Sequence, residues 1–516
     1  MRRAIRNLGR VWSIARTLAR HDALFPLEIL GAPRIFAFAI RLSGPRRIVN
    51  VRDKRPGERL ALALQALGPA FIKLGQGLAV RSDLVGDEIS ADLSALQDRL
   101  PPFSGAAARA IIEEQLGHPL DQLFDEFDDE PVAAASIAQV HRAVTADGTD
   151  VAVKVLRPEI EAAFRRDLDL MMWLAELADR HRPELRRLKP VEVVDTVAES
   201  VEIEMDLRFE AAAADELRAN LADETSFRVP TVVWSRTARR VLTTGWVSGA
   251  RINDREVLEA AGHDLEAIVA NMAKVLFLQV FRDGFFHADM HPGNLFIDEE
   301  GAVNAVDFGI MGRLDKKTRE YLAEMLLGFL TGDYRRVAEV HFKAGYVPAD
   351  QSVDAFAQAA RSIAEPILGL PLSDISLAKL LAQLFRITEK FKMETQPQLL
   401  LLQKTMLVAE GVGRRLYPEV NMWDLARPLI EDWMVREMGP ETRIRDAVGD
   451  VVRGLERLPR LLADMEDSFE TMRRSGLKLH PETVSAMTQA RRARVRRWPI
   501  WAAAAFGVAV IFVLVR

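Results

Sequence analysis

Cysteine is absent from the 516 residues of this sequence. Its absence excludes disulfides, catalytic thiols and metal sites built from thiolates, and it fits a reducing compartment. The sequence also lacks a surplus of basic residues, because its net charge is −5. The charge therefore gives no support to nucleic-acid binding. The chain has no internal repeat and no low-complexity linker, yet it is long enough for two or more domains.

Acidic residues are missing from the first twenty positions, which hold six arginines. On a helix, Leu8, Val11, Trp12, Ala15 and Leu18 fall on one face and most of the arginines fall on the other. Such a basic amphipathic helix can lie on an anionic membrane surface, and it can equally be a docking helix with a solvated arginine face. The continuous apolar stretch of a secretory signal is not present.

A long uncharged run stands at residues 498–515, after five arginines within 491–497. Its 18 residues, at about 1.5 Å per residue, are just long enough to cross a hydrocarbon core of about 30 Å. The arginines and the flanking Trp498 and Trp501 predict a C-terminal transmembrane helix, a single-pass anchor in the inner membrane with the catalytic body in the cytoplasm. A buried core helix and a segment that only dips into the interface are the alternatives.

The hydrophobic periodicity predicts an α+β protein with a small lobe that contains a sheet and a larger helical lobe. The predicted strands are residues 140–144, 151–155, 241–247, 295–297 and 302–306. The predicted helices are residues 59–100, 159–182, 191–221 and most of the chain after residue 265. The segment 345–480 is helical in pattern and carries no recognisable chemistry.

The run HADMHPGN, residues 287–294, carries Asp289 and Asn294 just before a predicted hairpin. The return strand of the hairpin ends in Asp307, so we expect Asn294 and Asp307 to lie close together. Their amide and carboxylate oxygens are ligands suited to Mg²⁺. Asp289 is then available to accept a proton from an attacking hydroxyl group or to orient a water molecule. Protein kinases use this arrangement for phosphoryl transfer from ATP.

Two other interpretations of these residues stay open. Asp289 and Asp307 can be ordinary loop acids, with Asn294 as a helix cap. His287, Asp289 and His291 can instead chelate a transition metal, although this leaves Asn294 and Asp307 without a role.

Lys154 lies on a predicted strand and faces the side opposite Val153 and Val155. A buried ammonium group without a partner is costly, so we expect nucleotide phosphates and a glutamate to surround it. The predicted helix 191–221 offers four candidates for this glutamate, Glu199, Glu202, Glu204 and Glu210. The residues alone do not choose among them.

A glycine-rich phosphate-binding loop is missing ahead of Lys154. Its place is taken by Ala133, Ala134, Ala135 and Ser136. Alanine restricts φ, and its Cβ keeps backbone amides further from a phosphate than glycine does. A conventional protein kinase is therefore disfavoured.

Six motifs occur in a fixed order: Lys73-x-Gly75-Gln76, AAASIAQVH, VAVKVLRP, Glu204-x-Asp206 followed by Glu210, HADMHPGN and Asp307-Phe308-Gly309. Together they resemble the UbiB family of atypical kinase-like proteins, which is linked to ubiquinone biosynthesis. The resemblance is specific, because ordinary kinases lack the K-x-G-Q element and the alanine loop. No flavin fingerprint, haem-ligand pattern or di-iron carboxylate pattern supports oxidation chemistry.

The resemblance implies a two-lobed protein-kinase-like fold with a helical N-terminal extension. It also implies that Lys154 pairs with Glu210 and that both act in catalysis with Asp289. ATP or ADP is expected at Lys154 and at the loop from Ala133 to Ser136. Mg²⁺ is expected at Asn294 and Asp307.

A regulatory role for the extension is also implied, with Lys73 and Gln76 over the active site near Glu204 and Asp206. If residues 191–221 form one helix, Glu204 and Glu210 are about 240° apart around its axis and face different partners. An extension over the site hinders a protein substrate and admits a nucleotide. A small or lipidic acceptor is therefore favoured.

The function implied is that of a membrane-associated ATPase or phosphotransferase supporting ubiquinone biosynthesis. Membrane lipid, prenylated quinone precursors and quinone-biosynthesis enzymes are the expected partners. A nucleotide-binding pseudokinase scaffold and a small-molecule kinase are the alternatives. The predicted domains are an N-terminal segment (1–58), the extension (59–130), a small lobe (131–249), a large lobe (250–480) and a basic stretch with a membrane anchor (481–516).

Overall fold

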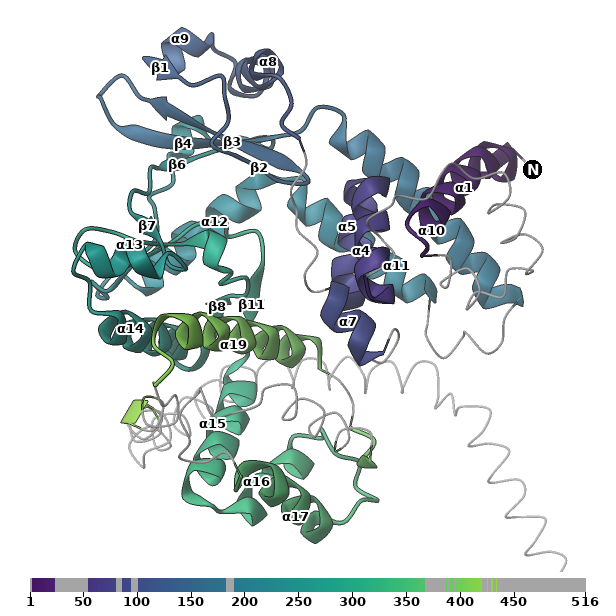
Figure 1. Cartoon of the computed structure of the whole chain (residues 1–516), viewed down its shortest axis with the longest axis vertical. Coiled ribbons are helices and arrows are strands. Elements are labelled where there is room, and N and C mark those ends of the chain that lie inside the picture. The colour runs from purple at the N-terminus through teal and green to yellow at the C-terminus, as the bar shows by residue number, and fades with distance from the viewer. Residues whose placement is uncertain are drawn as a thin grey trace, which may run out of the picture. The chain divides into compact units, whose positions relative to one another are not determined.

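The computed structural model describes residues 2–23, 54–79, 86–93, 101–181, 190–366 and 396–419, with positions 387, 390–393, 425, 428, 429 and 433. Within these residues the chain forms the predicted sheet-containing small lobe and helical large lobe, shown in Figure 1. Helices of the N-terminal extension pack beside them.

The small lobe is built on a five-stranded antiparallel sheet. Its strands are β1 (Glu126–Phe127), β2 (Ala133–Ala134), β3 (Ala138–Val144), β4 (Asp150–Leu156) and β6 (Val241–Gly245). The order is β1-β3-β4-β6, and β2 pairs with β3. Along β4 the fully buried Val151, Val153 and Val155 alternate with less buried residues, as expected for a strand whose two faces meet different surroundings.

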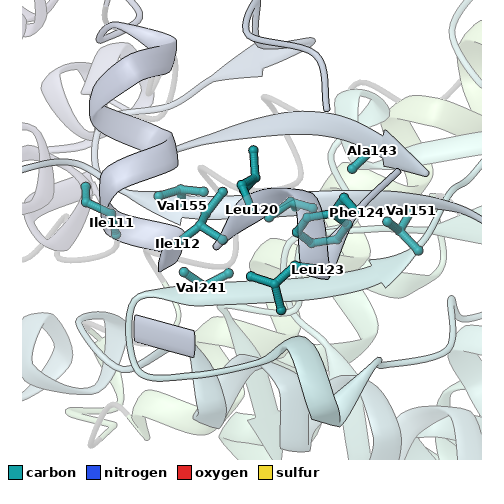
Figure 2. Close-up of a cluster of buried hydrophobic side chains, with 10 residues drawn as sticks. Ile111, Ile112, Leu120, Leu123, Phe124, Ala143, Val151, Val155 and Val241 are labelled. Atoms are coloured by element: carbon teal, nitrogen blue, oxygen red, sulfur yellow. The ribbon is translucent and has the colours of Figure 1, made fainter. Parts of the chain in front are cut away.

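The valine face of the sheet is covered by α8 (Gly105–Leu116) and α9 (Leu120–Leu123). Ser104 begins α8 by accepting a hydrogen bond from the Ala107 amide at 3.3 Å, and Gly117 ends it in the left-handed conformation at φ 72°. Figure 2 shows the core that results, in which Ile111, Ile112 and Phe124 pack on the strands. This core holds β4 in place and leaves its other face for the site.

Among the described residues, the α-helices between β4 and β6 in the sequence are α10 (Ile160–His181), α11 (Pro190–Glu204) and α12 (Leu207–Asn220). The single helix predicted for residues 191–221 is therefore wrong. The chain leaves the helix at Met205, and Asp206 restarts it by accepting a hydrogen bond from the Arg208 amide at 3.1 Å. Helix α12 lies under the sheet, on the side away from α8 and α9 (Figure 1).

The described helices ahead of the small lobe are α1 (Arg2–Arg20), in the predicted N-terminal segment, and α4 (Pro56–Leu67), α5 (Pro69–Ala79) and α7 (Asp87–Leu93), in the predicted extension. Helices α8 and α9 and strand β1, also predicted to belong to the extension, pack on the small-lobe sheet instead. Helix α1 is docked on protein: Ala15 and Leu18 are buried, and the Arg10 guanidinium donates to both carboxylate oxygens of Asp167 on α10 at 3.0 Å. Trp12 remains 42% exposed. Of the two interpretations of this helix, the docking helix is the one that these contacts support.

The large lobe combines helices with short strands. Its helices are α13 (Arg255–Ala260), α14 (Leu265–Phe277), α15 (Lys316–Thr331), α16 (Tyr334–Lys343), α17 (Val353–Ala364) and α19 (Pro397–Leu416), with the π-helix η4 (Leu278–Asp283) after α14. The predicted hairpin is present as β9 (Leu295–Ile297) and β10 (Val303–Ala305), which extend into a sheet through β5 (Phe227–Arg228) and β7 (Ala250–Arg251). A second ribbon, β8 (Phe285–His287) with β11 (Met311–Arg313), was not predicted.

The prediction that the fold includes a C-terminal transmembrane helix is not supported and has to be corrected. Among the described residues, no helix is long and apolar enough to cross a membrane. Residues 498–515 themselves lie outside the described ranges.

Replacing Ile112 by alanine tests the small-lobe core. Ile112 is fully buried in the cluster that supports β4, so Ile112→Ala is expected to reduce the free energy of unfolding by about 2–5 kcal/mol. Urea unfolding followed by tryptophan fluorescence measures the change. Glu114→Ala, on the exposed side of the same helix, serves as the control and is expected to shift it by about 0.5 kcal/mol or less. Equal effects of both substitutions would contradict this account of the core.

Candidate active site

Lys154 is the centre of the site. Its ammonium group donates to both carboxylate oxygens of Glu210, at 2.7 and 2.9 Å, and to Asp307 Oδ1 at 3.0 Å. Glu210 lies in the first turn of α12, and Asp307 follows β10. Of the four glutamates offered by residues 191–221, the structure therefore brings Glu210 to Lys154. One side chain of β4 thus joins the small lobe to the hairpin of the large lobe.

Asp307 adopts an uncommon backbone conformation. Its φ of 63° is positive, which costs energy for a residue other than glycine and is frequent at functional sites. The conformation separates two neighbouring side chains: Asp307 reaches Lys154 with a carboxylate that stays 48% exposed, whereas Phe308 is buried edge-on against His287, with ring centroids 5.4 Å apart. The acid is presented at the surface of the site while its neighbour fixes the turn.

The loop after β8 places Asp289 beside Asn294. The Asn294 amide nitrogen donates to the Asp289 carbonyl oxygen at 3.1 Å and lies 3.4 Å from its Oδ2. The backbone amide of Val306 donates to the backbone carbonyl oxygen of Asn294 at 2.9 Å, so the loop is tied to the strand that leads into Asp307. The predicted convergence of the two ends of the hairpin is present in the structure.

The two histidines of the loop, His287 and His291, make hydrogen bonds with backbone groups. His287 Nδ1 accepts from the Asp289 amide at 3.1 Å, and its Nε2 lies 3.3 Å from the Val306 carbonyl oxygen. His291 Nδ1 accepts from the Gly293 amide at 3.1 Å. Within the described part of the chain, no group of three or more His, Asp or Glu side chains could hold a metal ion. These contacts speak against the transition-metal interpretation of His287, Asp289 and His291.

The alanine loop lies on the face of the sheet that carries Lys154. The strand register aligns Ala133 with Val140 and Val140 with Lys154, which puts all three on one face. Ala133 is exposed, and Ala134 and Ala135 are half-buried. Ser136 is fully buried, and its hydroxyl has no hydrogen-bond partner among the described residues.

Arg157 fixes the same loop, and its role was not predicted. Its guanidinium donates to the Ala135 carbonyl oxygen at 2.8 and 3.1 Å and to the Pro101 carbonyl oxygen at 2.9 Å. The two bonds to Ala135 hold the loop without a glycine in it, and the third ties it to the chain at Pro101. The position directly after the strand of Lys154, in VAVKVLRP, was the available signal.

The extension reaches the site through Lys73 on α5. Its ammonium group lies 2.8 Å from Glu204 Oε2 at the end of α11, and the two side chains are only 11% and 10% exposed. Gln76 lies three residues further along α5. Asp206 caps α12 and pairs with Arg208 at 2.6 Å. The helix break, and not an angle around one helix, separates the partners of Glu204 and Glu210.

A residue from far along the sequence also enters the site. Lys404 on α19 has its Nζ 3.5 Å from Asp289 Oδ1, and the Thr405 hydroxyl lies 3.2 Å from the Ala288 carbonyl oxygen. Both belong to the segment 345–480, in which no chemistry was recognised. No local pattern in the sequence could have linked Lys404 to Asp289.

Neighbouring charges and burial together set the protonation states of Lys154, Glu210 and Asp307. The nearby Lys154 ammonium lowers the pKa of Asp307 to about 2, with smaller help from His287 and Lys73. Burial raises the pKa of Glu210 to about 7, against the attraction of Lys154. Burial alone would lower the pKa of Lys154, but the attraction of Asp307 and Glu210 outweighs it and raises this pKa. The site therefore holds a permanent cation beside an acid that stays ionised.

Replacing Lys154 by methionine leaves Glu210 buried without its cation. Lys154→Met is expected to reduce the free energy of unfolding by about 3–5 kcal/mol at pH 7.5. Burial already raises the pKa of Glu210 from its ordinary 4.5 to about 7 in the native protein, against the attraction of Lys154, and removal of that cation raises this pKa further. The extra cost of ionising Glu210 in the variant is therefore present at pH 7.5 and is lost at lower pH, where Glu210 is protonated in both folded proteins. The deficit of the variant is therefore expected to shrink at pH 5.5. Urea unfolding at both pH values measures it.

The double variant Lys154→Met/Glu210→Gln is the control for this pH dependence. It removes the acid that gains the proton, so its deficit relative to the native protein is expected to depend less on pH than that of Lys154→Met. A deficit of Lys154→Met that is the same at pH 5.5 and 7.5 would show that Glu210 is not the group responsible.

The sequence is similar to two protein-family models and to named proteins of two organisms. Residues 95–341 match the ABC1 atypical kinase-like domain, and residues 360–421 match the UbiB helical domain. A protein of Marinobacter nauticus named "Probable protein kinase UbiB" is 41% identical over 500 residues, which cover 95% of this chain and 91% of that protein. A protein of Aeromonas salmonicida with the same name is 43% identical over 442 residues, 83% of this chain and 80% of that protein.

A solved structure agrees with this. The complex of Rv3197 with erythromycin from Mycobacterium tuberculosis superposes with a TM-score of 0.52 at 26% sequence identity, covering 71% of this chain and 93% of that one. The kinase-like fold expected from the motifs is therefore confirmed. The resemblance from which it was inferred is confirmed as well: this chain belongs to the UbiB family of atypical kinase-like proteins.

Proposed function

We propose that this protein is a Mg²⁺-dependent ATPase or phosphotransferase that supports ubiquinone biosynthesis. The observation that carries the proposal is the contact of Lys154 with both Glu210 and Asp307, beside the loop that holds Asp289 and Asn294. Kinase-like enzymes use such a lysine for nucleotide phosphates and such acids for metal and proton transfer. The name that these relatives carry, "Probable protein kinase UbiB", supports kinase activity and a role in ubiquinone biosynthesis.

The residues at the predicted metal site fit Mg²⁺. Asp307 stays ionised over the physiological range and is half-exposed, and Asn294 uses its amide nitrogen toward Asp289, which leaves its amide oxygen as a ligand. Asn294 and Asp307 would hold the metal, which neutralises charge on the phosphates when bound. Carboxylate and amide oxygens are hard ligands, as Mg²⁺ requires.

The chain's own residues divide the remaining work. Lys154, held by Glu210, presents its ammonium to the α- and β-phosphates of ATP, and the alanine loop fixed by Arg157 lies on the same face of the sheet. Asp289 accepts the proton of the attacking hydroxyl or water as the new O–P bond forms and the bond to ADP breaks. The buried Lys73–Glu204 pair ties the extension to this region and favours a small or lipidic acceptor over a protein.

The partners of this protein are proposed from the family to which it belongs. Membrane lipid, prenylated quinone precursors and quinone-biosynthesis enzymes are those implied by the family. The described N-terminal helix adds little support for a membrane surface, because Ala15 and Leu18 of its apolar face are buried on protein and Arg10 pairs with Asp167. The nucleotide site therefore carries the proposal.

ATP hydrolysis by Asp289→Asn tests the proposal. The substitution removes the proton acceptor, so turnover is expected to fall by about 100-fold or more. The measurement is steady-state hydrolysis by the purified full-length protein in anionic liposomes with Mg²⁺. Glu299→Gln, an exposed acid-to-amide change on the neighbouring hairpin turn, is the matched control and should keep native turnover.

Two results would overturn this assignment of Asp289. One is native turnover in Asp289→Asn. The other is nucleotide binding with no hydrolysis in either protein, which would favour the pseudokinase scaffold.

Lys73→Met tests the electrostatic link between the extension and the metal site. Lys73 contributes to the low pKa of Asp307, so it places positive charge near the predicted Mg²⁺ position. Its loss is expected to tighten Mg²⁺ binding to the ADP complex by about 2- to 10-fold, because a repelling charge is removed. Isothermal titration with Mg²⁺ measures this, and Lys73→Arg should behave as the native protein. Unchanged Mg²⁺ affinity in Lys73→Met would contradict the link.

A further inference from the structure

Helix α19 touches the catalytic loop at two successive residues. Lys404 Nζ lies 3.5 Å from Asp289 Oδ1, and the neighbouring Thr405 hydroxyl lies 3.2 Å from the carbonyl oxygen of Ala288. Thr405 is fully buried, whereas the Lys404 side chain is 39% exposed. The Thr405 hydroxyl also lies 2.9 Å from the Leu401 carbonyl oxygen of its own helix, so it shares its hydrogen between the helix and the loop backbone. The preceding Lys404 carries a charge to the loop's acid.

The charge on Lys404 has no substitute within the loop. Residues 287–294 contain no lysine or arginine. The other two lysines of the site are engaged elsewhere, Lys154 with Glu210 and Asp307 and Lys73 with Glu204. Among the described residues, the ion pair with Lys404 thus brings a cation to Asp289 through a direct side-chain contact.

The two oxygens of the Asp289 carboxylate meet different neighbours. Lys404 lies at Oδ1, and the Asn294 amide nitrogen lies 3.4 Å from Oδ2. Neighbours on both oxygens favour one orientation of the carboxylate. The distances are long enough for solvent and substrate to compete, as the partial exposure of both side chains allows.

We propose that Lys404 is a positioning residue for phosphoryl transfer: from a helix outside the ABC1 domain, it orients the carboxylate of Asp289. The inference rests on the proposed function of Asp289 and adds a part to it. Helix α19 lies in the UbiB helical domain, residues 360–421, so the active site is complete only when this second domain is docked. The helical domain then does more than cover the kinase-like core.

Kinetics of Lys404→Met test the inference directly. Methionine keeps the length of the side chain and removes its charge, so kcat for ATP hydrolysis is expected to fall by about 10- to 100-fold, the effect of a misplaced catalytic group. The KM for MgATP is expected to change by less than about threefold, because Lys404 touches no predicted nucleotide-binding residue. Lys404→Arg should restore most of kcat. Arg415→Met, which removes an exposed charge from the same helix, is the matched control and should leave both constants unchanged.

Hydrogen exchange of the segment 286–295 provides a readout that needs no turnover. Exchange in this segment is expected to be faster by about threefold or more in Lys404→Met and unchanged in Arg415→Met, because only the first loses a contact to the loop. Native kcat in Lys404→Met, or equal losses in Lys404→Met and Arg415→Met, would overturn the inference. If the native protein does not hydrolyse ATP, the proposed function fails, and native exchange in Lys404→Met would overturn the positioning role separately.

Discussion

The site depends on one buried cation, the ammonium group of Lys154. Taking an ammonium out of water is costly, so the fold has to supply anions at short range, and it supplies two from different lobes, Glu210 and Asp307. The same strand satisfies a second demand, because its valines fill the core under α8 and α9 while Lys154 points the other way. The alternation of a single strand therefore couples the stability of the small lobe to the geometry of the site.

Around this cation, backbone hydrogen bonds do most of the positioning. His287 and His291 hold the loop of Asp289 and Asn294 through amides, and Arg157 holds the alanine loop through carbonyl groups. The side chains of Asp289 and Asp307 are thereby left partly exposed on a hydrogen-bonded frame. The proposed phosphoryl transfer would depend on such a frame, since its catalysis is mostly positioning and electrostatics.

The sequence predicted the parts of the site that are local and missed those that depend on distant packing. A strand pattern indicated the face of Lys154, and a short hairpin indicated that Asn294 and Asp307 meet. The break before α12 was missed, although an aspartate at position 206 is a common helix start. Strands β8 and β11, at three residues each, are too short to show a period, and no turn joins them directly. The equally short β9 and β10 were predicted because the turn at residues 299–301 connects them. Lys404 lies more than a hundred residues from Asp289, where no spacing rule reaches.

The break between α11 and α12 has a thermodynamic consequence. Glu204 at the end of α11 holds Lys73 of the extension, and Glu210 in the first turn of α12 holds Lys154, with only Met205 and the capping Asp206 between the two helices. If a partner binds the extension and shifts α11, its binding would change the free energy of nucleotide binding at the proposed site. Linkage is reciprocal, so the nucleotide would then change the affinity for that partner by the same factor. The two-residue break is the place where such a coupling would have to pass.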